Sequence, residues 1–187
     1  QIILNEDGIP VDVQRQERTP AHMLVEDLMI ATNEGVANWA IEQGVPVLYR
    51  IHEYPNDASL ETLRLVATEF GHSLPARKAK PRDFQRLIDS VKGRPEQAVI
   101  SVQVLRSLSR ARYSRSNEGH FGLASSAYVH FTSPIRRYPD LVVHRQLSRW
   151  LKEPRSARSV DLEWLDATAQ QASSQEQIAT EAARNSV

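Results

Sequence analysis

The sequence predicts a helix-rich α+β fold in which long helices pack beside short antiparallel strands. Two patterns support this class. Apolar residues recur with helical periodicity along most of the 187 residues, whereas runs of strand-forming residues are few and short. Hydrophobic residues make up 41% of the chain, so we expect one domain with a sizeable core.

A β-hairpin is expected at the start of the chain. Apolar runs at residues 1–4 and 9–13 flank the turn-forming stretch 5–8, Asn-Glu-Asp-Gly. The chain opens inside the first of these strands and carries no initiator Met, so we expect it to be a piece of a longer protein.

A long helix is expected from Thr19-Pro20 to Gly44, because threonine caps a helix start and proline fits its first turn. His22, Glu26 and Asn33 fall close to one stripe of this helix, so the three side chains could face the same way. Alternatively, they form its solvated face.

The middle of the chain is expected to contain one strand and several helices. Residues 45–53 form a strand-like run in which Arg50 and His52 share a face, either for structural support or close to a ligand. The basic stretch 75–82 either contacts phosphate or is a solvated loop. Helices are expected at residues 59–71, 83–91 and 96–113.

The densest set of chemically active side chains lies in residues 120–145. The turn at 132–134, Thr-Ser-Pro, is expected to cap a helix that carries apolar residues to about residue 151. Arg136 and Arg137 leave this turn beside the helix N-terminus, where guanidinium forks attract phosphate. Alternatively, the two arginines are solvated or form an ion pair, for example with Asp140.

Aromatic and histidine side chains surround this turn. The aromatic residues either stack on bases or pack beneath the turn: Phe121, Tyr128, Phe131 and Tyr138. His120, His130 and His144 are ten and fourteen residues apart, which is not the spacing of a zinc site, so we expect stacking or packing for His120 and His130. His144 follows Asp140 by four residues and is expected to hydrogen-bond to it. A polar linker then leads to a last helix at 160–185.

Two motifs in this region resemble the ribonuclease II / ribonuclease R family of processive 3′-to-5′ exoribonucleases. They are His-Phe-Gly-Leu-Ala at residues 120–124 and Tyr-x-His-Phe-Thr-Ser-Pro-Ile-Arg-Arg-Tyr-Pro-Asp-Leu-x-x-His-Arg at 128–145. In that family the first arginine after Ser-Pro-Ile binds the scissile phosphate, which implies this catalytic role for Arg136. The resemblance implies a general phosphate contact for Arg137.

Further segments carry the resemblance. Residues 21–33, Ala-His-x-Leu-Val-Glu-Asp-Leu-Met-Ile-x-x-Asn, are similar to the family's channel-lining helix, whose leading glutamate, here Glu26, reads the ribose hydroxyl. One departure is Ala183 before Arg184, where relatives carry an acid; Glu181 is a candidate substitute. The implied RNA-binding residues are Glu26, Asn33, Arg50, His52, His120, Tyr128, His130, Ser133, Arg137 and Tyr138.

The family hydrolyses RNA to 5′-nucleoside monophosphates with magnesium held by an aspartate cluster. The chain has no such cluster, so we expect the magnesium ligands upstream of Gln1 and no metal ligand within residues 1–187. The family's flanking OB-fold domains are also missing. We therefore expect a C-terminal portion of the catalytic domain that is inactive alone.

The expected partners are single-stranded RNA and the remaining half of the catalytic domain with its OB-folds. The alternative function is a non-catalytic RNA-binding or scaffold module derived from the same family. The 23 basic and 23 acidic residues cancel, which is unusual for a free nucleic-acid binder. No run is long enough to span a membrane, and the absence of cysteine fits a cytoplasmic protein.

Overall fold

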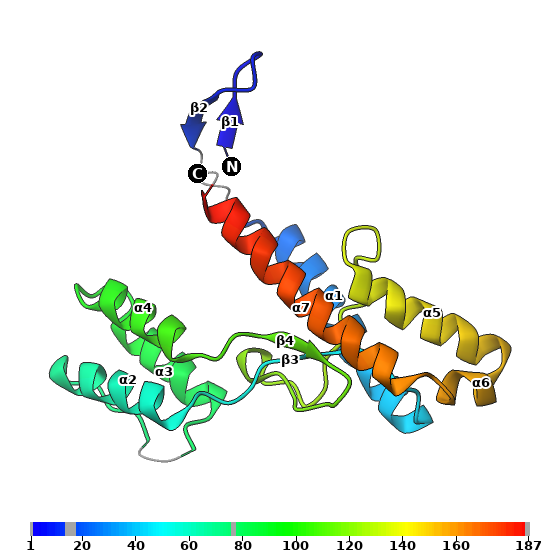
Figure 1. Cartoon of the computed structure of the whole chain (residues 1–187). Helices are drawn as coiled ribbons and strands as arrows, with labels where there is room; N and C mark the ends of the chain where they lie inside the picture. Colours follow the sequence, from blue (N-terminus) through cyan, green and yellow to red (C-terminus); the bar gives the residue numbers. More distant parts are fainter. Residues whose placement is uncertain (1, 14–17, 76–77, 186–187) are drawn as a thin grey trace. The chain divides into compact units, whose positions relative to one another are not determined.

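A computed structural model describes residues 2–13, 18–75 and 78–185, and the chain divides into two units, Gln1–Thr32 and Asn33–Val187 (Figure 1). The structure confirms the predicted helix-rich α+β class. Its elements are β1 (Ile2–Leu4), β2 (Pro10–Val13), α1 (Pro20–Gln43), β3 (Tyr49–Ile51), α2 (Asp57–Glu69), α3 (Pro81–Val91), α4 (Gln97–Ser107), β4 (Arg112–Ser114), η1 (Phe121–Leu123), α5 (Tyr138–Lys152), α6 (Pro154–Arg158) and α7 (Leu162–Asn185).

The first unit contains the predicted hairpin and the first part of α1. Strands β1 and β2 are antiparallel, and the side-chain oxygen of Asn5 accepts from the backbone nitrogens of Asp7 and Ile9, which stabilises the turn between them. The hydroxyl of Thr19 accepts from the backbone nitrogen of His22 at 3.4 Å, in agreement with the predicted cap of α1.

A three-helix group in the second unit is formed by α2, α3 and α4, which share one apolar core. Leu63, Leu87 and Ile100 each contribute a buried side chain to it. The side chain of Asn56 caps α2 by accepting from the backbone nitrogen of Ser59 at 2.8 Å, three residues before the start expected from the sequence. In the basic stretch 75–82, residues 76 and 77 lie outside the described residues.

Strands β3 and β4 pair antiparallel. The three-helix group lies between them in the chain, which leaves β3 to enter α2 and returns from α4 to β4. The predicted helix at 96–113 is therefore wrong at its end: α4 stops at Ser107, and residues 112–114 form a strand. The physical reason is tertiary. Tyr113 pairs with Arg50 across the strands and is buried there, which a continued helix would prevent.

Helices α5, α6 and α7 complete the second unit. The sequence predicted a linker where α6 lies, but Pro154 begins a short helix that buries Ala157. Helix α7 packs against β4 and α5 through Leu165 and Ala169, which share a core with Tyr113. Among the described residues, no helix is long and apolar enough to cross a membrane.

A close approach of backbone and side chain at Gly122 gives a stability prediction. A Cβ atom at Gly122 would lie 2.7 Å from Nδ1 of the largely buried His52, so we expect Gly122→Ala to lower the free energy of unfolding by about 1–3 kcal/mol. Urea denaturation measures this change in the free energy of unfolding.

Gly35→Ala is the control, because a Cβ atom there meets nothing within 4 Å and α1 should gain about 0.5–1 kcal/mol. Equal stability of the two variants would contradict the described packing of His52.

Candidate functional site

The residues that precede α5 form a tight turn, here named the arginine loop (residues 132–137). The backbone oxygen of Ser133 accepts from the backbone nitrogens of Arg136 and Arg137, at 3.2 and 3.1 Å. The expected hydroxyl cap is wrong, because α5 begins only at Tyr138 and has no side-chain cap. The loop is instead stabilised by an acid inside the first turn of the helix.

That acid is Asp140, whose side chain is fully buried. Its Oδ1 accepts from the backbone nitrogen of Ser133 and from a terminal nitrogen of Arg137, and its Oδ2 accepts from Nε of Arg137, each at 2.8 Å. This bidentate pair uses the guanidinium fork of Arg137, so the ion-pair alternative applies to this arginine. Its phosphate contact stays a prediction.

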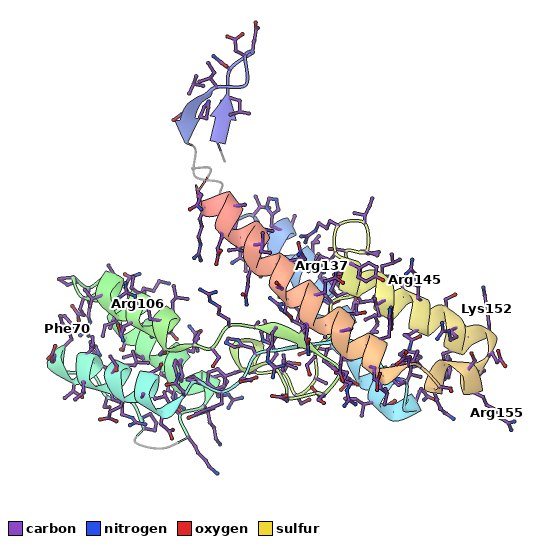
Figure 2. All side chains as sticks on the ribbon, viewed as in Figure 1. Phe70, Arg106, Arg137, Arg145, Lys152 and Arg155 are labelled. Atoms are coloured by element: carbon purple, nitrogen blue, oxygen red, sulfur yellow. The ribbon has the colours of Figure 1, made fainter. Side chains whose placement is uncertain are left out.

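Arg136 differs from its neighbour. Its side chain is exposed, and within the described residues no acid forms an ion pair with it. It lines a hollow of about 720 Å³ whose wall includes Tyr138 and, from α7, Trp164 and Glu176. Figure 2 labels Arg137 at the start of α5, and Arg137 also lines this hollow. Two adjacent arginines thus have different roles: one fixes the loop, and the other faces open space.

Glu176 was missed by the sequence reasoning, although it lies in the centre of the site. It accepts from both terminal nitrogens of Arg50, at 2.6 and 3.0 Å, and Arg50 also lies 4.7 Å from the ring centroid of Tyr113. Glu176 lines the Arg136 hollow and a smaller one of about 260 Å³ that includes Arg110 and Arg184. Only the fold brings Arg50 and Glu176 together, across 126 residues.

Asn33 connects α1 to the segment before the arginine loop. It is only 2% exposed; its amide nitrogen donates to the hydroxyl of Tyr128 at 2.9 Å, and its amide oxygen accepts from the backbone nitrogen of Phe131 at 3.0 Å. His22 and Glu26 of the same predicted stripe are exposed in the first unit, where Glu26 forms an ion pair with Arg18. RNA contacts by Asn33, Tyr128 and Glu26 stay predictions.

The histidines of the site are partly or largely buried. Nδ1 of His130 lies 2.8 Å from the hydroxyl of Tyr113; burial, with the charges of Arg137 and Arg50, lowers the pKa of His130 to about 3. Burial lowers the pKa of His120 to about 4 and also lowers that of His52. The rings of His52 and His120 meet edge to face, with their centroids 5.1 Å apart. All three are therefore neutral at pH 7.

The predicted hydrogen bond from His144 to Asp140 is wrong. Nε2 of His144 lies 2.9 Å from the backbone oxygen of Phe131, and the two rings are stacked with centroids 3.9 Å apart. Asp140 has other partners, because Arg137 and Ser133 occupy its oxygens.

A metal ion does not fit the residues present. The described ranges contain no group of three or more His, Cys, Asp or Glu side chains that could hold one. Two of the histidine nitrogens have other partners: Nδ1 of His120 accepts from the backbone nitrogen of Leu123, and Nδ1 of His130 lies 2.8 Å from the hydroxyl of Tyr113.

Comparisons with known proteins agree with the motifs. Residues 1–153 match the family described as the RNB domain. Ribonuclease R of Aquifex aeolicus is 40% identical over 183 residues, which cover 97% of this chain and 26% of that protein. The chain spans about a quarter of the length of the curated relatives it matches.

Solved structures show the same fold. Mycoplasma genitalium RNase R in complex with ribose-methylated single-stranded RNA matches with a TM-score of 0.87 at 26% identity, over 99% of this chain and 30% of that one. Yeast Ssd1, a pseudonuclease, matches with a TM-score of 0.71 at 24% identity, over 83% and 20% of the two chains. The second likeness concerns the fold alone.

Removing the charge of Asp140 tests its role in the arginine loop. We expect Asp140→Asn to lower the free energy of unfolding by about 3 kcal/mol, because it leaves Arg137 without its partner in a largely buried place. Chemical denaturation provides the measurement. The matched control is Asp166→Asn, which breaks a half-exposed pair with Arg115 and should cost about 0.5 kcal/mol. Similar losses would refute the role given to Asp140.

The lowered pKa of His130 predicts loss of stability in acid. Between pH 7 and pH 5 the unfolded chain protonates this histidine near its ordinary pKa of 6.5, whereas the folded chain does not. Because of this group, the free energy of unfolding falls by about 2 kcal/mol between pH 7 and pH 5. His130→Gln should remove that part of the dependence. Denaturation of both proteins at the two pH values measures it, and identical pH dependence would contradict a neutral, buried His130.

Proposed function

The chain belongs to the RNB domain family, and from this premise we propose that it forms the C-terminal part of the catalytic domain of a processive, magnesium-dependent 3′-to-5′ exoribonuclease. The proposed reaction hydrolyses single-stranded RNA to 5′-nucleoside monophosphates. This chain supplies contacts to the RNA channel and to the scissile phosphate. A cytoplasmic location stays a prediction.

The observation that carries this proposal is Arg136, which is exposed and forms no ion pair with any described residue, in a loop that Asp140 fixes through Ser133 and Arg137. Charge accumulates on the phosphoryl oxygens as the P–O bond breaks, and a cation already in place stabilises it without reorganisation. Asp140 holds the guanidinium group of Arg137. The guanidinium group of Arg136 is available to bind two phosphate oxygens.

We propose further RNA contacts for residues inside and outside this hollow. Tyr138 is 50% exposed and lines the hollow, which suits stacking on a base. Ser133 and Arg137 lie in the arginine loop. Arg50, His52, His120 and His130 are partly or largely buried, and we name these four residues the buried layer. We propose that the buried layer positions the loop. Glu26 would accept from a ribose 2′-hydroxyl, which distinguishes RNA from DNA.

Catalysis requires residues that this chain does not contain. No metal-binding cluster occurs within the described ranges, so we propose that the magnesium ligands, and the OB-fold domains, belong to other parts of the protein. By itself the 187-residue chain should not cleave RNA. The structural neighbours support RNA as the ligand, since M. genitalium RNase R was solved with single-stranded and with double-stranded RNA.

A second candidate is a non-catalytic RNA-binding or scaffold module. A yeast protein described as a pseudonuclease shares the fold, so the fold alone is compatible with both candidates. The two candidates differ in the rest of the protein: aspartates at metal-ligand spacing there support the enzyme, and their loss supports the scaffold.

Arg136→Ala tests the enzymatic role. In the complete protein with magnesium, we expect its turnover of single-stranded RNA to fall by about 10²–10³-fold while RNA affinity changes little, because Arg136 acts mainly as the bond breaks. Gel-based digestion and filter binding measure the two quantities. Arg106→Ala, an exposed arginine at the end of α4, is the control and should retain activity. Unchanged cleavage by the Arg136 variant would remove this residue from the mechanism.

A further inference from the structure

The outer face of α5 carries a row of side chains of which the proposed site uses only the first, Tyr138. Tyr138, Arg145, Arg149 and Lys152 are all exposed, and their spacing of i, i+7, i+11 and i+14 places them on one side of the helix. We name them the α5 stripe. It extends over about 21 Å at the rise of an α-helix. Figure 2 labels Arg145 and Lys152 along α5, with Arg137 at its start.

The positive charge of the α5 stripe is not neutralised. In the part of the chain that the structure describes, Arg145, Arg149 and Lys152 form no ion pair, although basic and acidic residues are equal in number overall. The acid of α5 itself, Asp140, is buried against Arg137, and Glu153 follows only after the helix ends. The face therefore presents three cations in line.

A structural role explains only part of this arrangement. Cations in the last turn complement the helix dipole, which accounts for Arg149 and Lys152. The dipole effect does not reach Arg145, two turns from the end. Instead, the guanidinium carbon of Arg145 lies 6.0 Å from the ring centroid of Tyr138.

Tyr138 connects the stripe to the Arg136 hollow, because its side chain also lines that hollow. The cations thus begin at the proposed phosphate site and continue away from it along α5. A protein partner would need an apolar centre, but the exposed side chains between Arg145 and Lys152 on this face are those of Ser148 and Arg149. Evenly spaced cations beginning at an exposed aromatic ring suit a nucleic-acid backbone.

We propose that the α5 stripe is a track for the phosphate backbone of single-stranded RNA that continues beyond the Arg136 hollow. This inference rests on the proposed function. The three cations contact successive phosphates, and Tyr138 stacks on a base where the strand passes from the hollow onto the helix. The track contributes affinity and orientation, whereas bond cleavage depends on Arg136.

The test is the salt dependence of RNA binding by the protein that carries this chain. The probe is a fluorescein-labelled oligouridylate, in EDTA to prevent hydrolysis, followed by anisotropy between about 50 and 200 mM KCl. The variant is Arg145→Gln/Arg149→Gln/Lys152→Gln. Losing three phosphate contacts should make the slope of log K against log [KCl] less steep by about 2. Lys92→Gln/Arg106→Gln/Arg155→Gln, which removes three exposed cations away from α5, at the end of α3, in α4 and in α6, should leave the slope unchanged.

Charge-retaining Arg145→Lys/Arg149→Lys should keep the wild-type slope, so a folding defect of the glutamine variant would not hide the effect. A slope and affinity equal to those of the control variant would overturn the RNA track. Unchanged RNA binding with lost binding to polyglutamate or to phosphatidylglycerol vesicles would assign the surface to another partner and also overturn it. If the glutamine variant keeps the wild-type slope while Arg136→Ala loses turnover, the RNA track is wrong but the proposed function still holds.

Discussion

The buried carboxylate of Asp140 determines the structure of the site. One side chain without solvent exposure accepts from the backbone of Ser133 and from two nitrogens of Arg137. A buried carboxylate is costly unless a cation and hydrogen bonds compensate it, so the turn and Arg137 must adopt this arrangement together. Arg136 lies outside this network, and its guanidinium forms no ion pair with the residues that the structure describes.

The buried layer consists mostly of groups that are neutral at pH 7. Burial keeps His120 and His130 uncharged, and Asn33 uses both ends of its amide to hold Tyr128 and Phe131. Two bidentate pairs carry charge here: Arg50 of the buried layer with Glu176, and Arg137 of the arginine loop with Asp140. Each acid fixes the guanidinium of its arginine, while the lowered pKa values keep His120 and His130 neutral at pH 7.

Local signals in the sequence predicted much of the fold. The hairpin turn, the Thr19 start of α1 and the expected helices depend on residues close together in sequence, and they are found with shifted ends. Strand β4 was missed because the helical pattern before it continued through Tyr113, and only pairing with Arg50 makes it a strand. The sequence predicted a turn with both arginines before α5, which the structure contains, but the pattern Arg-Arg could not show which arginine pairs with Asp140. Glu176 is too distant from Arg50 in sequence to leave a signal.

Strands β3 and β4 give the molecule a modular property. Because Ile51 pairs with Arg112, the three helices between them form one very long hairpin connection that starts and finishes at neighbouring points. An insertion of this kind can be shortened, exchanged or enlarged during evolution without altering the strands that carry it. Phe121, which packs on the core of the three-helix group, is the side chain that any replacement would have to cover.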